Sequence, residues 1–383
     1  MTILSSIQDL RTNLVTRFPE REGVIDGTLA AVLAGEHVLL LGPPGTAKSA
    51  LTREIAQAFG GTYFERLLTK FSTPEELFGP VSLKALERDE FTRVVTGKLP
   101  EAHFAFVDEV FKANSAILNS LLTLANERLF HNGTAPVRCP LISLFGASNE
   151  LPEGKELEAL WDRFLLRFEV NYLLRPSNFR LVLVANDAPA APTLDLATFR
   201  AAQDEVSKTR VTDPTVDALL EIRDVLKAEG IVGSDRRWKK SLKLVQAAAF
   251  LSGANETAPE DLGILVDALW REPKERPKVA RIVGRLADPL STQATEILDV
   301  ALETSARVAG LDRSERSKYV AEAARALEEF RHQQQKLAEL AKGAGRRAAK
   351  TIADAAQQVQ QLHAELARSL SQGLGLAGLR SVK

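Results

Sequence analysis

The residues most able to do chemistry lie in a glycine-rich segment, 42–49. An apolar run at 38–41 has the length and branching of a buried parallel strand, and it breaks at 42–45, which reads Gly-Pro-Pro-Gly. A helical pattern begins at Lys48. Glycines let backbone N–H groups converge on an anion, and the following helix directs its positive end at the same point. We therefore predict a phosphate-binding loop in which Lys48 neutralises the β- and γ-phosphates and the Ser49 hydroxyl ligates Mg²⁺.

The loop departs from the usual pattern at Ala47, where glycine commonly precedes the lysine. Alanine is compatible with the loop if residue 47 already has the negative φ of a helical residue. The alternative is a strand–turn–helix that binds nothing. The predicted nucleotide-binding residues are Gly42, Pro43, Pro44, Gly45, Thr46, Ala47, Lys48, Ser49, Ala50 and Asp108.

Two adjacent carboxylates end a second apolar strand at 103–109. Asp108 is positioned there to hold Mg²⁺ through water, and Glu109 to polarise the attacking water. The interval from Lys48 leaves room for one helix, one strand and an insertion, as a nucleotide-binding sheet requires. Such a strand end alone is often only a strand that meets solvent, but together with the loop it predicts nucleotide hydrolysis.

Two further candidates follow a third apolar strand at 141–147. Asn149 can orient the lytic water and contact the γ-phosphate, or it can be a turn or helix-cap residue. Arg163 comes just after a predicted helix at 157–161. It is either a surface charge, paired with Asp162 or Glu169, or a finger that reaches the nucleotide of a neighbouring subunit.

A basic run at 236–240, Arg-Arg-Trp-Lys-Lys, opens a predicted helix. Such a run is usually a solvated face, so one of its cations at most is expected to act on the γ-phosphate. We favour Arg236. Arg237 fits nearly as well, and a shift in alignment would move the role to Lys239.

The elements that must hold these residues divide the chain into three parts. Residues 1–176 predict an α/β core with a parallel sheet, 177–270 an all-α lid, and 271–383 a helical C-terminal region. In the last part, apolar residues recur in steps of three and four from 352 to 366, as in a bundle or coiled coil that docks a partner helix. The alternative there is a disordered basic tail.

Two insertions interrupt the core. Extended runs at 81–83 and 91–95, around a charged stretch, predict a β-rich insertion. Residues 129–138 predict a hairpin that turns at Asn132-Gly133. We assign both insertions to substrate or partner contact, with surface decoration as the alternative.

The composition restricts the function classes. The 383 residues include 49 basic and 50 acidic side chains, and the net charge of −1 argues against general nucleic-acid binding. Cys139 is the single cysteine, which excludes an internal disulfide and fits a reducing compartment. No apolar run approaches the roughly 18 residues that a membrane span needs, and the N-terminus does not have a signal-peptide pattern, so a cytoplasmic protein is expected.

Four segments, 42–49, 106–109, 147–150 and 162–164, together resemble the MoxR group of AAA+ ATPases. Further segments resemble the RavA branch of that group. These are 96–102, 112–114, 116–119, 126–128 and 234–240.

The resemblance covers about residues 5–270. It implies an AAA+ αβα fold with a lid, ATP and Mg²⁺ as cofactors, a ring of six subunits, and catalytic roles for Glu109, Asn149, Arg163 and Arg236. It further implies an ATP-hydrolysing machine that remodels protein clients with a von Willebrand factor A-domain partner. The alternative function is a nucleotide-gated interaction scaffold with little turnover. A helicase or clamp loader uses similar motifs, but the neutral charge and the lack of aromatic platforms argue against it.

Overall fold

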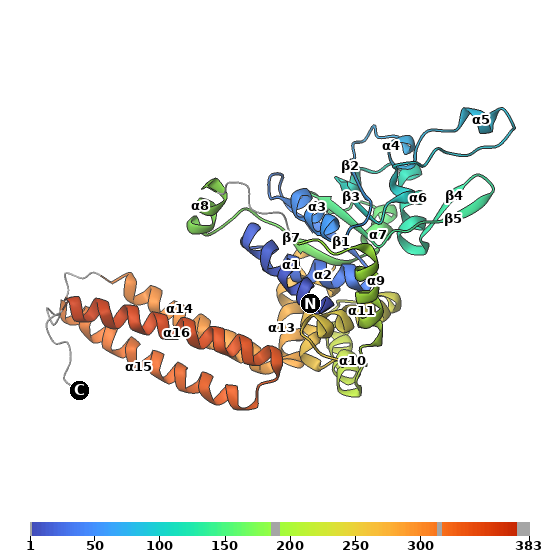
Figure 1. Ribbon diagram of the computed structural model, residues 1–383. Helices are drawn as coiled ribbons and strands as arrows, with labels where there is room; N and C mark the ends of the chain where they lie inside the picture. Colours follow the sequence, from blue (N-terminus) through green and yellow to red (C-terminus); the bar gives the residue numbers. More distant parts are fainter. Residues whose placement is uncertain (1, 185–191, 312–315, 374–383) are drawn as a thin grey trace. The chain divides into compact units, whose positions relative to one another are not determined.

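Five parallel strands form one sheet within the first 170 residues of the chain, in the order β2-β3-β6-β1-β7 (Figure 1). Every residue of β1 and β6 is buried, which explains why both read as continuous apolar runs in the sequence. The strands are β1 (His37–Leu41), β2 (Tyr63–Leu67), β3 (Phe104–Asp108), β6 (Ser143–Ser148) and β7 (Phe164–Glu169). The predicted α/β core with a parallel sheet is confirmed.

The computed structural model describes residues 2–184, 192–311 and 316–373, which form two compact units. The first unit contains the described residues up to 216, together with 226–258 and 264–279. The second contains 217–225, 259–263 and the described residues from 280 onward. The division after residues 176 and 270 that the sequence suggests stays a prediction.

Helices of the first unit cover the sheet. α2 packs against β1 and β7, and α3 against β2 and β3. The Asn114 side chain begins α6 by accepting a hydrogen bond from the Ile117 N–H (3.1 Å), and Gly35, with φ of +69°, ends α2. The helices are α1 (Ile3–Arg17), α2 (Glu22–Ala34), α3 (Lys48–Ala58), α6 (Ser115–Glu127), α7 (Lys155–Trp161), α8 (Pro176–Val184) and α9 (Leu196–Lys208).

The first insertion differs from the prediction, because it is not β-rich. It contains α4 (Pro74–Phe78) and α5 (Leu83–Leu86), and its extended pairing is limited to one bridge between Val81 and Arg93. The Ser82 hydroxyl accepts a hydrogen bond from the Ala85 N–H (3.3 Å), and this cap turns the predicted extended run into a helix.

The predicted hairpin is confirmed as β4 (Leu129–Asn132) and β5 (Ala135–Arg138). Its turn lies one residue later than predicted, at Gly133-Thr134, and Gly133 has φ of +76°. The Asn132 side chain instead holds the first insertion, since its Oδ1 accepts from the Arg93 N–H (2.6 Å) and its Nδ2 donates to the Arg93 carbonyl (3.1 Å).

The lid and the C-terminal region are helical, as predicted. The lid helices are α10 (Asp213–Ala228), α11 (Asp235–Leu251), α12 (Val266–Leu269) and α13 (Arg276–Ala287). Three long helices follow in the second unit and lie side by side (Figure 1): α14 (Pro289–Ala309), α15 (Arg316–Leu340) and α16 (Arg346–Gly373). Phe330, Ile352 and Val359 are buried among them, so the three-and-four periodicity marks a bundle helix.

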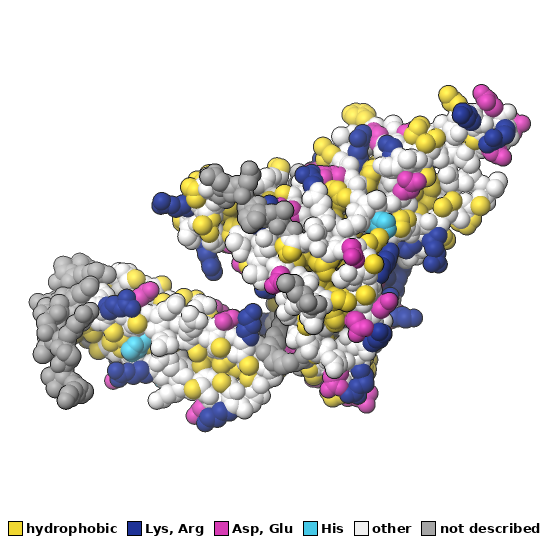
Figure 2. Space-filling model, viewed as in Figure 1, with side chains coloured by type: hydrophobic (Ala, Val, Ile, Leu, Met, Phe, Trp, Pro, Cys, Tyr) yellow, Lys and Arg dark blue, Asp and Glu magenta, His cyan; other side chains and the backbone are white. Residues whose placement is uncertain are grey.

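On the face seen in Figure 2, basic side chains of the described residues lie among acidic ones and form no continuous basic surface. Within the described part of the chain, no helix has both the length and the apolar character that crossing a bilayer requires.

Candidate nucleotide site

The strand register brings three of the sequence motifs to one edge of the sheet. Leu41 pairs with Ser148 on one side and with Glu169 on the other, and Leu67 pairs with Asp108. Because all five strands are parallel, their carboxyl ends meet at this edge, where open α/β sheets bind ligands. The segment 42–47, the Asp108–Glu109 pair and Asn149 therefore belong to one site.

The loop begins at Gly42, directly after β1, and leaves the sheet between β6 and β7. The Gly42 N–H donates to the Ser148 carbonyl (3.0 Å), and φ at Gly42 is +149°. A Cβ atom at this position would lie 2.1 Å from the carbonyl oxygen of Val170, so only glycine fits.

Lys48 lies at the centre of the loop and is 9% exposed. Its ammonium donates to the carbonyl oxygens of Gly42 and Pro43, both at 2.8 Å, and lies 3.4 Å from the Thr46 hydroxyl. Burial lowers the pKa of Lys48, while the charges of Asp108 and Glu109 act in the opposite direction. The cation is thus held inside the loop within electrostatic range of both carboxylates.

Ala47 has φ of +65° and ψ of 23°, so the expectation that residue 47 is helical with negative φ is wrong. Gly45 also has positive φ, at +80°, and the residue between them does not. When the sign of φ alternates from residue to residue in this way, successive backbone N–H groups point inward and form an anion-binding nest. The geometry of the nest therefore imposes a left-handed conformation on an alanine, which costs about 1–2 kcal/mol relative to glycine.

The carboxylates of Asp108 and Glu109 have different surroundings. The Asp108 Oδ1 accepts a hydrogen bond from the Glu109 N–H (3.0 Å), and Glu109 itself has φ of +51°. The Glu109 Oε2 atom is buried, accepts no hydrogen bond from the described residues, and lies 3.4 Å from the Lys112 ammonium. A buried carboxylate oxygen without a hydrogen-bond donor fits the predicted contact with a water molecule.

These groups fit a magnesium–nucleotide complex. The Ser49 hydroxyl lies on the first turn of α3, and the Asp108 carboxylate lies at the end of β3. Hydroxyl and carboxylate oxygens are ligands that Mg²⁺ prefers, and the buried ammonium of Lys48 suits a phosphate. Ser49 and Asp108 are thus the residues that would hold the ion.

Asn149 follows the last residue of β6 and is exposed. The Ser148 hydroxyl forms a tight turn around it, accepting from the Glu150 N–H (3.0 Å) and donating to the Glu150 carbonyl (2.7 Å). Asn149 therefore lies at the apex of a turn, next to the Ser148 carbonyl that accepts from the Gly42 N–H, and its role stays a prediction.

One residue at this edge has no counterpart among the sequence predictions. The Tyr172 hydroxyl donates to the carbonyl of Pro44 (3.3 Å). The sequence does contain a signal that could have identified Tyr172. It is an aromatic residue just beyond the last strand of the sheet, and that strand ends at the same edge as the loop.

Arg163 lies at the opposite edge of the sheet. It precedes Phe164, which pairs with His37 at the amino end of β1, whereas the loop follows the carboxyl end of β1. Five strand residues at about 3.3 Å each separate these ends by roughly 16 Å. The structure does not bring Arg163 to the loop of its own chain, and Glu169, one of its two predicted partners, lies at the far end of β7.

Arg163 and Arg236 are neighbours. The Arg163 side chain is 17% exposed, its Nε atom is buried with no acceptor among the described residues, and its Nη1 lies 4.0 Å from Asp162. Burial and the charge of Arg236 lower the pKa of Arg163. Arg236 itself is exposed and donates to Asn126 Oδ1 (3.2 Å), at the end of α6 that also contacts His37. Both arginines therefore lie away from the phosphate loop of their own chain.

Arg237 has a different environment from Arg236, although the two are adjacent. Its side chain is 4% exposed and joins α11 to the amino end of β7. The guanidinium donates to Asp162 Oδ1 (3.2 Å) and to four carbonyls, those of Asp162 (3.1 Å), Phe164 (3.1 Å), Leu165 (2.9 Å) and Ala268 (2.6 Å). These partners occupy the whole guanidinium, which favours Arg236 over Arg237 as a group that contacts phosphate. Lys239, the third alternative, is exposed.

Comparison with known proteins agrees with this geometry. Residues 5–202 match the family described as the MoxR domain in the MoxR-vWA-beta-propeller ternary systems, and residues 214–283 match the AAA lid domain. An uncharacterized protein of Methanocaldococcus jannaschii is 43% identical over 76% of this chain and 80% of its own length. The chaperone MoxR1 of Mycobacterium tuberculosis is 28% identical over 40% of this chain and 41% of its own length.

The fold also resembles that of a solved structure. The crystal structure of a candidate ATPase from Cytophaga hutchinsonii aligns with a TM-score of 0.62 and 18% identity, covering 75% of this chain and 95% of that one. At this identity the likeness supports the fold alone.

We predict that Ala47→Gly stabilises the protein by about 1 kcal/mol, because glycine adopts positive φ without a Cβ clash. Urea unfolding of the nucleotide-free protein measures the difference. Ala50→Gly is the matched control on α3, where the same change should cost about 0.5–1 kcal/mol. If Ala47→Gly were also destabilising, residue 47 would not be left-handed in solution.

We predict that Arg237→Ala lowers the free energy of unfolding by at least about 3 kcal/mol, since it leaves a carboxylate and four carbonyls without their donor. Lys239→Ala, two residues away on the exposed side of α11, should change it by no more than about 0.5 kcal/mol. If both variants changed the free energy of unfolding by equally small amounts, Arg237 would not stabilise the contact between α11 and β7.

Proposed function

Because the chain belongs to the MoxR family of AAA+ ATPases, we propose that it binds ATP with Mg²⁺ at residues 42–50 and hydrolyses it to ADP and phosphate. One observation carries the proposal. The buried Lys48 ammonium lies within range of the charges of Asp108 and Glu109 at the carboxyl edge of the sheet. Glu109 Oε2 is buried there near Lys112, and no described residue donates a hydrogen bond to it.

The residues of the loop bind and orient the triphosphate. Lys48 exchanges its bonds to the carbonyls of Gly42 and Pro43 for phosphate oxygens, which gain a full counter-charge in a poorly solvated site. Mg²⁺, held by Ser49 and through water by Asp108, supplies further neutralisation of the β- and γ-phosphates when it is bound. Gly42 lets the loop approach the sheet closely enough for these contacts.

Glu109 and Asn149 act on the water. Glu109 Oε2, which lies 3.4 Å from the Lys112 ammonium, accepts a hydrogen bond from the attacking water. It takes up the water's proton as the new bond to the γ-phosphorus forms and the bond between that phosphorus and ADP breaks. The Asn149 amide, on the turn next to Gly42, orients that water and contacts the γ-phosphate.

Arg163 and Arg236 act on the nucleotide of an adjacent subunit. Both lie at the amino edge of the sheet, roughly 16 Å along the strands from the loop of their own chain. A guanidinium that Asp162 only approaches, at 4.0 Å, is available for charge that builds up on the γ-phosphoryl oxygens. This arrangement supports a ring, which the resemblance to the family suggests has six subunits.

The ring is proposed to remodel protein clients together with a von Willebrand factor A-domain protein. The family that matches residues 5–202 is described by systems that combine MoxR with vWA and beta-propeller proteins. The two insertions offer a contact surface, because Leu83 is 77% and Phe91 60% exposed, and Asn132 joins the insertions through Arg93. Assignment to the RavA-like branch belongs to the same proposal and is supported by segments such as 96–102 and 234–240.

Two substitutions separate binding from chemistry. Glu109→Gln keeps the size of the side chain but cannot accept the proton, so ATP should stay bound while turnover falls by at least about a hundredfold. Lys48→Ala, by contrast, should abolish binding. Calorimetric titration with ATP and a phosphate-release assay measure the two effects. Near-normal turnover in Glu109→Gln would assign the water to another group.

Mixing two inactive variants tests the shared site. Arg163→Ala subunits keep Lys48, and Lys48→Ala subunits keep Arg163, so a mixed ring contains some interfaces with both residues. Each variant alone should lose most activity, since such fingers contribute on the order of 10³–10⁵ in rate. We expect partial recovery of ATPase activity in the mixture. The absence of recovery in rings shown by native mass spectrometry to be mixed would contradict a finger that acts between subunits.

A further inference from the structure

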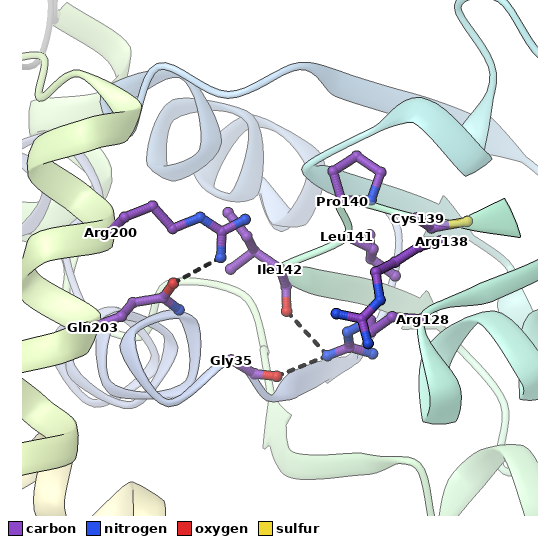
Figure 3. Close-up of a pocket in the computed structure, with 9 residues that line it drawn as sticks. All are labelled: Gly35, Arg128, Arg138, Cys139, Pro140, Leu141, Ile142, Arg200 and Gln203. Carbon is purple, nitrogen blue, oxygen red and sulfur yellow. Dashed lines mark hydrogen bonds between the residues drawn. The ribbon is translucent and has the colours of Figure 1, made fainter.

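A pocket of about 570 Å³ opens on the first unit, apart from the phosphate loop (Figure 3). Gly35, at the end of α2, and Ile142, just before β6, place it near the amino edge of the sheet. The remaining lining residues come from the ends of α6 and β5, from the irregular segment leading into β6, and from α9. They are Arg128, Arg138, Cys139, Pro140, Leu141, Arg200 and Gln203. None of the residues proposed for ATP hydrolysis lines this pocket.

The pocket is cationic. Three arginines line it and no acidic residue does. Among the described residues the Arg138 side chain has no ion-pair or hydrogen-bond partner, and the Arg200 side chain donates only to the neutral amide oxygen of Gln203 (3.1 Å). Gln203 is oriented for this role because its Nε2 donates to the Val32 carbonyl (3.1 Å).

The groups behind the pocket neutralise these charges only in part. Glu36 is a counter-charge for Arg128, but it is buried and also pairs with Lys240 at 2.6 Å. Burial raises the pKa of Cys139 to about 11, so its thiol stays neutral. His37 accepts from the Leu144 N–H through Nδ1 (2.9 Å), and burial keeps its pKa well below the usual value, so it stays neutral as well.

Arg128 is fixed in place before any ligand binds. Its backbone is left-handed, with φ of +58°, and its guanidinium donates to the carbonyls of Gly35 (2.8 Å), Ile142 (3.2 Å) and Ala125. These are neutral acceptors, and burial lowers the pKa of Arg128 to about 10. A partly desolvated cation that is held rigidly and shares its counter-charge with Lys240 binds an anion with little loss of side-chain entropy.

We propose that this pocket binds a small phosphate-bearing molecule, with Arg138 and Arg200 as its mobile ligands and Arg128 as its fixed one. Planar guanidinium forks match phosphate oxygens in bidentate geometry. The volume lies within the range of small-molecule sites. The walls at Pro140, Leu141 and Ile142 are apolar and leave space for an uncharged part of the ligand, as in a nucleoside phosphate. The arginines alone would also accept an inorganic polyphosphate, so these are the two sources to distinguish.

Calorimetry on the full chain tests the proposal, with Lys48→Ala present throughout to disable the phosphate loop. Inorganic pyrophosphate and ADP are the two probes. We expect at least one of them to bind, and the affinity to fall at least about tenfold when Arg138→Ala and Arg200→Ala are added. Binding of both probes indicates recognition of phosphate alone, and binding of ADP only indicates a nucleoside phosphate.

Arg88→Ala is the matched control, since Arg88 is an exposed arginine of the same unit that pairs with Glu90 instead of lining the pocket. It should leave the affinity unchanged. Arg138 and Arg200 are themselves exposed, so the triple variant should unfold within about 0.5 kcal/mol of its parent. The proposal is overturned if neither probe binds at millimolar concentration, or if the triple variant binds as tightly as Lys48→Ala alone.

Discussion

The constraint on which the rest of this structure depends is the parallel pairing of β1 on both of its sides. Hydrogen bonds to β6 and β7 bury the whole strand, so polar side chains are confined to its two ends. The carboxyl end opens into the loop that begins at Gly42. The amino end meets the ends of α2 and α6 and the start of β7. One sheet thus gives the molecule two chemically different edges separated by the length of a strand.

The two edges are complementary in charge. The carboxyl edge combines one buried ammonium, Lys48, with two carboxylates, and it has the geometry to hold a nucleotide and a water. The amino edge carries several arginines, among them Arg163, which Asp162 approaches only to 4.0 Å, and Arg138 in the pocket. Because a strand separates them, the arginines of one subunit cannot complete the phosphate site of that subunit. This separation is the physical basis of the proposed ring, in which the arginines would act on the nucleotide of an adjacent subunit.

The parts of this candidate site that could be predicted from the sequence are those in which the chemically active residues lie within a recognisable local pattern. The loop and its flanking strands were predictable because a buried strand, a glycine turn and a helix start each have their own signal. The sign of φ at Ala47 was not, since residue type alone disfavours the left-handed conformation that the nest imposes. The extended run at 81–83 was misread because a single cap, from Ser82, decides between helix and strand over so short a segment.

Other features depend on tertiary placement and left no local signal. Arg236 and Arg237 are adjacent in the sequence, and only the rotation of α11 against β7 makes one exposed and the other an internal strut. Arg128, Arg138 and Arg200 come from three elements, and nothing in the sequence indicates that they line one pocket. Tyr172 contacts the loop only because β7 ends beside β1.

The same tertiary contacts fix the lid helix α11 to the amino edge. Arg237 ties it to β7, and Lys240 ties it to the end of α2 through Glu36 (2.6 Å). The guanidinium of Arg167, fully buried on β7, lies 4.6 Å from the ring of Trp161 and donates to the carbonyl of Trp270, which links the lid to α7 as well. Breaking buried charged contacts of this kind costs several kcal/mol, so these contacts hold α11 firmly against the amino edge of the sheet. Arg236 is therefore fixed to this edge by the helix that carries it, away from the loop of its own chain.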